Sequence, residues 1–499
     1  MTLIWLFIIP LLGGLAAWTF GNRNNHARWI SLAALGIDAV LLVDLWSTAS
    51  SQIALDRGAW LVEVSLPWIP QLGISLHLGM DGLSLVLVSL TLFLGIISVL
   101  CSWTEVRERV GFFHMNLLWI LTGILGVFMA LDLFLFYFCW ELMLVPMYFL
   151  INIWGHEDRV YASLKFFIFT QAGGLLMLLS ILALYFIHGR DTGQYTFDYT
   201  LLLGTAMSPG TAFWIMLGFV IAFIVKLPAI PFHPWLPDAH TEAPTAGSVV
   251  LAGLLLKTGA YGLLRFVLPL FPEAVATIGQ VMLVLGVIGI VYGAVLAFGQ
   301  TDLKRLVAYT SVSHMGFVLI GIFAGSQAAL SGAVMQMVAH GVSTGALFII
   351  VGFIQERVHT RDMDHMGGFW STAPRLGSVG LVFALASLGL PGFGNFVAEF
   401  LVLLGSYRTH SVITALAAAG LVLSAIYSLW IVQRVLHGRK QEGGGLVDLS
   451  LRETGMMAAL VLAVLWLGLY PRPVLRTVEP IMHAIATHAG AATVQGGEQ

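Results

Sequence analysis

The stretch FVIAFIVKLPAIPFHPWLPDAH, residues 219–240, decides the fold, because it places a lysine at the end of an apolar run and then interrupts the helix. Four prolines follow Lys226, at Pro228, Pro231, Pro234 and Pro237. Proline lacks an N–H and ends or kinks a helix, and broken helices at membrane depth are tolerated where they line a cavity or are buried in protein. The stretch therefore predicts a functional break inside a membrane span. The alternative is that Lys226 extends to the interface and the prolines form a loop.

The composition of the whole chain is that of a membrane protein. Of its 499 residues, 58% are hydrophobic and only 10% are Asp, Glu, Lys or Arg, against roughly 25% in a soluble domain. So few charges cannot cover the surface of a soluble protein of this length, which excludes a soluble enzyme, a disordered chain and a fibrous repeat. The net charge of −3 carries no signal for a nucleic-acid partner, and we expect none.

The two cysteines, Cys101 and Cys139, both lie in apolar stretches. They are too few for a disulfide framework, a zinc site or an iron–sulfur cluster, so we expect no metal and no cofactor in this chain. The apolar N-terminus, residues 1–18, is followed rather than preceded by its nearest charges, Arg23 and Arg28. A secretory signal has the reverse order, so we expect an uncleaved first span.

Fourteen stretches have the length and apolar character of a bilayer-crossing helix, which needs about 20 residues. They lie at 2–20, 29–47, 80–101, 112–130, 132–153, 162–188, 211–229, 244–269, 275–298, 304–325, 328–354, 376–405, 411–434 and 454–471. The expected fold class is therefore all-α integral membrane, with about 14 transmembrane helices. The gaps at 48–79 and 189–210 are of loop size. The tail, 472–499, is polar or weakly amphipathic, and we expect its end, 490–499, to be disordered.

The distribution of Lys and Arg indicates the orientation of the chain. Fifteen of the 23 lie in one set of alternate loops, and Lys226 and Lys257 lie inside spans. The opposite set of loops holds six: Arg57, Arg190, Arg265, Arg408, Arg472 and Arg476. Because positive loops stay in the cytoplasm, we expect both termini outside it.

Six ionisable residues lie at bilayer depth, where such a group is costly unless it is paired or hydrated and therefore predicts an ion path. In order along the chain they are Glu141, Lys226, Lys257, His314, His340 and Glu399. The structural alternatives are an ion pair that holds two helices together and a hydrogen-bonded histidine in the bundle core. Small neighbours at Gly253 and Gly259 let helices approach Lys257 closely and leave room for water.

A second break interrupts the twelfth span, in GLPGFGNFVAEF at 389–400. We expect Asn395 to cap the following half-helix and Glu399 to lie just past its first turn, where the helix dipole favours a carboxylate. The breaks at Lys226 and Glu399 are five spans apart, an odd number, so two tandem five-span units would run in opposite directions. The sequence thus predicts two inverted five-helix repeats with broken helices 7 and 12.

The same count divides the chain into four parts. Residues 1–110 hold spans 1–3, 111–270 the first five-span half, 271–437 the second half, and 438–499 the last span and tail. There is no complete G-x-G-x-x-G opening a soluble βαβ unit, no Walker A sequence and no C-x-x-C motif. We therefore expect the driving force to come from an ion gradient or from partner subunits.

Four stretches carry a resemblance to a known family. They are FCWELMLVPMYFLINIWG at 138–155, the lysine-bearing segment at 226–266, DLKRLVAYTSVSHMGF at 302–317 and GLPGFGNFVAEF at 389–400. Together they resemble the antiporter-like membrane subunits of respiratory complex I, and the resemblance covers nearly the whole chain. Within that group the chain resembles one subunit type in two features. Its twelfth span has a glutamate where the sister subunits typically carry a lysine, and the chain ends soon after the fourteenth span.

The resemblance implies a proton-translocating role, in which partner subunits holding flavin and iron–sulfur clusters pass electrons from NADH to quinone. The proton path it implies runs through Glu141, Lys226, Lys257, His314, His340 and Glu399. The first two would be a coupled pair, since unit charges about 4 Å apart at an effective dielectric near 20 interact by around 4 kcal/mol. The implied partners are the other membrane subunits, especially sister subunits L and N, with lipids and protons, in a bacterial inner membrane.

Three other functions remain open at this point. The same fold and lysines occur in multi-subunit cation/proton antiporters and in proton-pumping hydrogenase-type complexes. A non-transporting scaffold that anchors a peripheral enzyme is the third.

Overall fold

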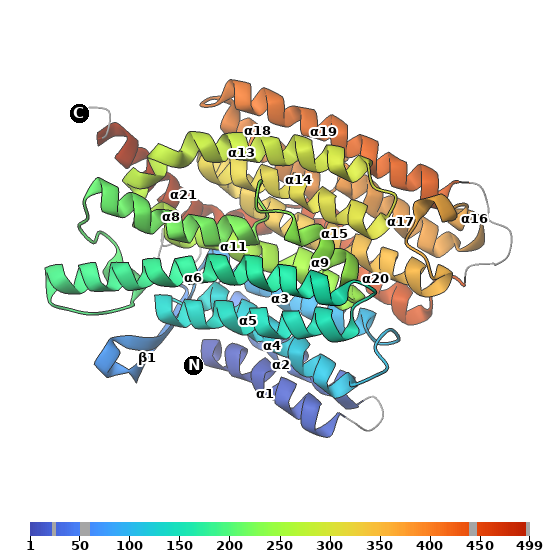
Figure 1. Ribbon diagram of the computed structural model, residues 1–499, viewed down its shortest axis with the longest axis horizontal. Coiled ribbons are helices and arrows are strands. Elements are labelled where there is room, and N and C mark those ends of the chain that lie inside the picture. Colours follow the sequence, from blue (N-terminus) through green and yellow to red (C-terminus); the bar gives the residue numbers. More distant parts are fainter. Residues whose placement is uncertain (22–25, 50–59, 439–446, 496–499) are drawn as a thin grey trace.

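The computed structural model describes residues 1–21, 26–49, 60–438 and 447–495, and most of them are helical. Figure 1 shows long helices lying side by side, with chain reversals gathered at two opposite ends. In chain order the helices and strands are α1 Thr2–Phe20, α2 His26–Ala49, β1 Val62–Ile69, η1 Pro70–Leu72, β2 Ile74–Met80, α3 Gly82–Cys101, α4 Val110–Met129, α5 Leu133–Trp154, α6 Arg159–Thr192, α7 Tyr199–Leu202, α8 Pro209–Lys226, α9 Trp235–Glu242, α10 Thr245–Val250, η2 Leu251–Leu255, α11 Leu256–Gly262, η3 Leu263–Val267, α12 Leu268–Leu270, α13 Pro272–Phe298, α14 Leu303–Phe323, α15 Gln327–Val358, η4 Met363–His365, α16 Phe369–Thr372, α17 Pro374–Ser387, α18 Gly394–Tyr407, α19 Ser411–Ile431, η5 Val432–Leu436, α20 Leu451–Leu469 and α21 Arg472–Gln495.

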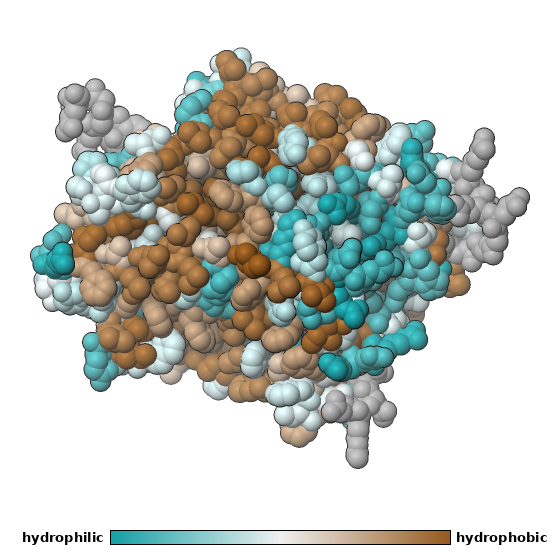
Figure 2. Space-filling view, viewed as in Figure 1, coloured by the Kyte–Doolittle hydropathy of each residue, from teal (hydrophilic) through white to brown (hydrophobic). Residues whose placement is uncertain are grey.

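Within the described residues, 13 helices are long and apolar enough to cross a membrane. The remaining expected span, the twelfth, is divided between two shorter apolar helices, α17 and α18. The expected all-α membrane class is therefore confirmed. Figure 2 shows a mostly apolar surface over the left and upper parts of the molecule and a hydrophilic surface from the centre toward the right, the side where α16 lies. Large exposed side chains such as Ile168, Trp214 and Val281 belong to this apolar exterior, as a lipid-facing surface requires.

The gap at 48–79 is not simply a loop. Its described part contains an antiparallel hairpin of β1 and β2, with Gly73 in the left-handed region at the turn (φ 68°). Leu78 of β2 also pairs with Ala130 in the turn between α4 and α5. The expectation of a loop was wrong here because two short strands with little apolar alternation pair with each other around a tight turn. Residues 50–59 lie outside the described part of the chain.

The tail is also more ordered than expected. From Arg472 it forms α21, which packs against α3 and α15. Val474, Val478, Met482 and Ile485 are buried, at a spacing that repeats every three or four residues on one helix face. The expectation of a disordered end at 490–499 is wrong as far as Gln495, and its last four residues lie outside the described part.

Arg265, which the sequence analysis counted in a loop, lies inside the span Thr245–Leu270. It lies in the π-helical turn η3, is buried, and forms an ion pair with Asp81. Asp81 also accepts a hydrogen bond from the N–H of Ser84 and so caps α3. The pair joins the start of the third span to the eighth span.

The two breaks lie where the sequence expects them. α8 ends at Lys226 and α9 begins at Trp235, while α17 ends at Ser387 and α18 begins at Gly394. In both parts of the chain the first two helices pack together (α4 with α5, α13 with α14) and the third packs on the broken one (α6 with α8, α15 with α18). This shared pairing is what two repeats would give, and the inverted repeat itself stays a prediction.

A buried histidine fixes the hairpin at the end opposite the arginine-rich loops. His77 of β2 is 4% exposed, with Nε2 2.7 Å from Glu63 Oε1 and Nδ1 2.7 Å from Asp198 Oδ2. Burial alone lowers the pKa of His77, but the two carboxylates outweigh burial, and its pKa is raised. The imidazolium therefore holds the hairpin to the segment before α7.

This histidine makes the hairpin sensitive to pH. A pKa raised by folding means that the protonated imidazole stabilises the hairpin fully below its ordinary pKa near 6.5, and that this contribution is lost as pH rises through the folded value. We expect hydrogen-exchange protection of the β1 amides, corrected for intrinsic rates, to fall as pH rises from about 6 to 9. In His77→Gln the protection should not change with pH, and an equal fall in both proteins would contradict this assignment.

Candidate functional site

The six ionisable residues singled out from the sequence all lie in the middle of the helix bundle. All except Glu141 are at most 1% exposed. They come from six different helices, Glu141 from α5, Lys226 from α8, Lys257 from α11, His314 from α14, His340 from α15 and Glu399 from α18. An arrangement of this kind places ionisable groups where water-poor surroundings make every charge interaction strong.

Among the described residues, Lys226 has no hydrogen-bond acceptor for its ammonium group. The helix stops at this residue, and the indole N–H of Trp235 donates to the freed carbonyl of Val225 at 2.9 Å. The Nζ atom lies 4.8 Å from the ring centroid of Trp140 and 5.8 Å from that of Phe166. Aromatic faces attract a cation, so the broken helix holds the lysine in a place where it is attracted but not bonded.

Glu141 lies beside this lysine without bonding to it. Its Oε1 is buried and has no hydrogen-bond donor in the described part of the chain, and the two side chains interact through their charges. Gly174 of α6 makes room for the carboxylate, because a Cβ there would lie 2.7 Å from Oε1. The pair is therefore coupled by charge, while the carboxylate also has hydrogen-bond interactions with Tyr137 and Gln171.

Lys257 lies between two π-helical turns, η2 and η3. Its ammonium donates to the carbonyl oxygen of Ala252 in η2 and to Nδ1 of His340 at 2.7 Å. α15 approaches through a pair of glycines, since a Cβ on Gly341 would lie 2.9 Å from the carbonyl oxygen of Gly253. π turns widen a helix locally and are frequent at functional sites. Here the widened turn supplies the carbonyl, and the glycines bring the histidine within reach.

His314 and Glu399 form the second bonded group. His314 Nδ1 lies 2.9 Å from Glu399 Oε1, and the amide of Gln336 donates to the same oxygen at 3.0 Å. On the other side of the ring, Nε2 lies 3.2 Å from the hydroxyl of Tyr427. A carboxylate accepts hydrogen bonds and a hydroxyl can donate one, so this geometry assigns the proton of a neutral His314 to Nδ1.

The two bonded groups meet at the histidines. The rings of His314 and His340 are 5.6 Å apart between centroids, at an interplanar angle of 67°. Because Lys257 donates to Nδ1 of His340, a neutral His340 carries its proton on Nε2, which has no partner among the described residues. Lys257, His340, His314 and Glu399 thus make one row of groups that can each accept and release a proton.

The sequence analysis did not single out several polar residues that lie close to this row. Gln336 lies one turn before His340 on α15, and that spacing could have found it. His240 of α9 is fully buried, stacks on Phe348 and has no described partner for either ring nitrogen. Tyr427 carries no sequence signal.

The expected cap of α18 is wrong. Phe393 is the N-cap, and Asn395 lies inside the first turn with both side-chain polar atoms buried and without a partner in the described part of the chain. The loop residue Gly389 (φ 77°) instead lies close to the carboxylate, where a Cβ would be 3.1 Å from Glu399 Oε2. The break therefore brings a glycine of the connecting segment, rather than a capping side chain, next to the glutamate.

These groups can transfer protons and hold charge. Among the described residues no cluster of three or more His, Cys, Asp or Glu side chains could hold a metal ion, and both cysteines are buried. A many-span bundle with broken helices and a buried row of acids, lysines and histidines defines the class of ion-translocating membrane proteins.

Comparison with known proteins gives the family. Residues 130–426 match the model of the NADH:quinone oxidoreductase/Mrp antiporter transmembrane family, and the chain belongs to this family. It is 53% identical to NADH-quinone oxidoreductase subunit M of Pseudomonas aeruginosa, over 99% of each chain.

Solved structures agree with this assignment. A chain of respiratory complex I from Thermus thermophilus with bound NADH superposes with a TM-score of 0.88 at 31% identity, over 98% of this chain and 100% of that one. A chain of the Mrp complex from Dietzia has a TM-score of 0.82 at 18% identity, over 98% of each chain, which shows a shared fold.

The glycine crossing beside Lys257 generates a prediction. In Gly341→Ala the new Cβ meets the backbone of Gly253, so α15 must shift and the bond between His340 and Lys257 must lengthen. We expect transport activity of the assembled complex to fall at least about tenfold, the equivalent of about 1.4 kcal/mol. Gly345→Ala, one turn further on, is the control, because its nearest neighbour would be 3.7 Å away. Equal activity of the two variants would show that the crossing does not matter.

Proposed function

We propose that this chain is a proton-translocating membrane subunit of an NADH:quinone oxidoreductase. The observation that carries the proposal is the row from Lys257 through His340 and His314 to Glu399. Lys257 Nζ lies 2.7 Å from His340 Nδ1, and the centroids of the two histidine rings are 5.6 Å apart. His314 Nδ1 lies 2.9 Å from Glu399 Oε1. Each member can exist in two protonation states, and each is joined to a neighbour in the row by a hydrogen bond or an ion pair. The high identity to a relative named subunit M over the whole chain supports this function over that of a cation antiporter.

The pair of Glu141 and Lys226 is the proposed switch of the first half. The lysine rests over Trp140 without a described acceptor, so its charge is stabilised mainly by its surroundings and by the nearby carboxylate. Moving the carboxylate away removes that attraction and favours release of the lysine's proton toward Lys257. Moving it closer holds the proton, and a charge change in a neighbouring subunit could act through this step.

The second half is proposed to end the path. Glu399 accepts from His314 and Gln336, and its Oε2 has no described partner at the break between α17 and α18. A proton that arrives on the carboxylate can therefore leave from Oε2, on the side that faces Gly389. We assign the first half to residues 111–270 and the second to 271–437, between an N-terminal part, 1–110, and a last span and tail, 438–499.

The proposed setting is the bacterial inner membrane, with both termini outside the cytoplasm. Electron transfer belongs to partner subunits that carry flavin and iron–sulfur clusters, and this chain would itself hold no cofactor. Its neighbours would be the sister antiporter-like subunits L and N. The driving force would then reach this chain as charge and conformational changes at its contacts with these neighbours.

The role of Glu141 can be tested in membrane vesicles. Glu141→Gln keeps the size of the side chain but removes the charge that couples to Lys226. We expect the complex to assemble, and NADH-driven quinone reduction and proton uptake to fall together by about tenfold or more. Assembly is measured on a native gel before the activities.

The control is Glu273→Gln, an exposed glutamate in the first turn of α13. It should leave assembly, electron transfer and uptake at the level of the unmodified chain. Normal uptake in Glu141→Gln would remove this residue from the path. Assembly failure in that variant alone would indicate that the carboxylate holds helices together.

A further inference from the structure

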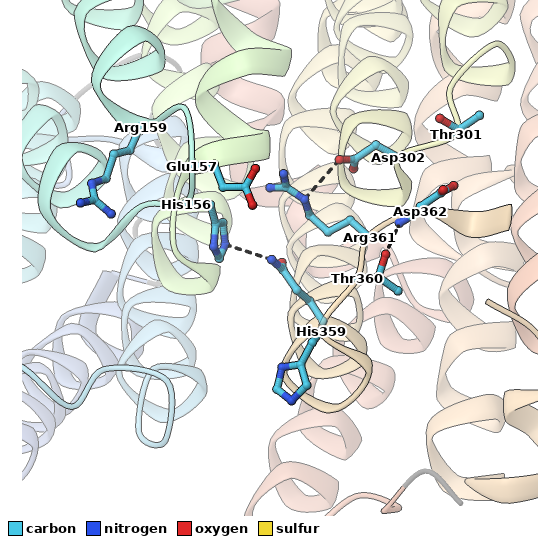
Figure 3. Close-up of a pocket in the computed structure, with 10 residues that line it drawn as sticks. His156, Glu157, Arg159, Thr301, Asp302, His359, Thr360, Arg361 and Asp362 are labelled. Carbon is cyan, nitrogen blue, oxygen red and sulfur yellow. Dashed lines mark hydrogen bonds and ion pairs between the residues drawn. The ribbon is translucent and has the colours of Figure 1, made fainter. Parts of the chain in front are cut away.

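Two cavities open at the arginine-rich end of the bundle. One, of about 630 Å³, is lined by residues of the α5–α6 turn and of the segments around Asp302 and Arg361, and Figure 3 shows them facing one space. The second, of about 690 Å³, is lined among others by Thr104, Glu105 and Thr245. Three residues line both: His156, Gln355 and His359.

Two of the residues that line both cavities, His156 and Gln355, contact each other through uncharged polar groups. The amide nitrogen of Gln355 lies 3.4 Å from Nε2 of His156, and this contact is drawn in Figure 3. Burial lowers the pKa of His156 to about 3, with further lowering by the charges of Lys304 and Arg361. The imidazole is therefore neutral at working pH, and water in either cavity meets a hydrogen-bonding group rather than a fixed charge there.

Glu105 lies on the inner side of the second cavity. Its carboxylate accepts from the backbone N–H of Thr245 at 2.9 and 3.2 Å and from the Thr245 hydroxyl at 3.0 Å. Burial raises the pKa of Glu105, although these hydrogen bonds and the charge of Lys304 oppose the rise. Thr245 begins the span that contains Lys257, twelve residues further along. The acid thus faces water on one side and the start of this span on the other.

Ionisable groups continue inward from Glu105. Lys304 is 1% exposed, donates to the carbonyl of Ala243 at 2.5 Å, and interacts with the charge of Glu105. His240 follows, with both ring nitrogens buried and without a described partner, and it interacts with the charges of Lys304 and Lys257. Charge interactions thus link Glu105 to Lys304, Lys304 to His240, and His240 to Lys257, and this series does not include Glu141 or Lys226.

We propose that the second cavity is the inlet through which the central row is loaded with protons, and that Glu105 collects them. From Glu105 the proton passes by Lys304 and His240 to Lys257. Glu356, which lines the same cavity and interacts with Glu105, favours its protonated form by like charge. The inlet rests on the proposed proton-translocating function, and it enters the row directly at Lys257, its first member, rather than by way of Glu141 and Lys226.

The first test closes the cavity in the assembled complex. Thr104→Cys places a thiol on the exposed lining next to Glu105, and both native cysteines of the chain are buried. After reaction with a bulky maleimide we expect NADH-driven proton uptake to fall at least about threefold, relative to the same unreacted sample. Glu108→Cys, on the exposed part of the same loop but outside the lining, should lose nothing on labelling. Equal uptake of the two labelled variants, or a Thr104→Cys variant whose new thiol does not react, would overturn the inlet.

The second test removes the acid. Glu105→Gln keeps an oxygen that can accept from Thr245, so the start of the span stays capped, but it cannot collect a proton. Uptake should fall about tenfold or more, while Glu108→Gln stays normal and Glu105→Asp recovers most of the loss. Uptake in Glu105→Gln equal to that of Glu108→Gln would overturn the proposal. If Glu105→Gln does not assemble, the labelling result decides.

Lys257→Met separates this proposal from the function on which it rests. Loss of uptake in Lys257→Met with normal uptake in Glu105→Gln would reject the inlet and keep the function. Normal uptake in Lys257→Met would reject both.

Discussion

The hydrogen bond between the ammonium of Lys257 and Nδ1 of His340 is the contact on which the centre of this protein depends. Lys257 has no exposed surface, and hydrogen-bond acceptors offset the cost of several kcal/mol that an unpaired charge carries in the bilayer interior. One acceptor is the carbonyl of Ala252, in the π turn, and the other is a histidine on a helix that two glycines bring close. The π turn, the glycine crossing and the tautomer of His340 are all consequences of satisfying this one cation.

The two halves of the row differ in how their charges are satisfied. The Glu399 carboxylate is held by a histidine and an amide, and the Glu141 carboxylate interacts with Tyr137 and Gln171. The two lysines differ, since Lys257 is hydrogen-bonded whereas Lys226 Nζ has no hydrogen-bond partner among the described residues. Both halves nevertheless place an ionisable residue beside a broken helix. A helix break leaves backbone groups without their helical partners and lowers the energy of small backbone movements. The same feature is therefore compatible with a bonded pair, His314 and Glu399, and with an unbonded pair, Glu141 and Lys226. A transporter needs such a difference between its halves to move a proton in one direction.

The sequence was sufficient for the features that depend on hydropathy and on breaks. Apolar length predicted the spans, and Pro228 and Pro391 with their neighbours predicted the two interruptions. A charged residue in an apolar run is informative by itself, which is why Glu141, Lys226, Lys257 and Glu399 were found. The inverted repeat and the roles of these residues stay predictions.

Features that depend on tertiary distance could not be predicted. Tyr427 and His240 look like ordinary polar residues until the helices around them are in place. Arg265 was assigned to a loop because its partner Asp81 is 184 residues away in the chain. Short alternating strands such as β1 and β2 are easily missed between long apolar segments, and the side-chain contacts of Asn395 cannot be read from its position after a break.

The most direct test of the central row is proton uptake by the assembled complex with His340→Gln. Glutamine keeps an oxygen that can accept the hydrogen bond of Lys257, but it cannot take up and release a proton at working pH. If protons pass from Lys257 through His340 to His314, the complex assembles and NADH-driven uptake through this subunit is lost. Normal uptake in His340→Gln would contradict the account, because the row would then be a structural network and not a path.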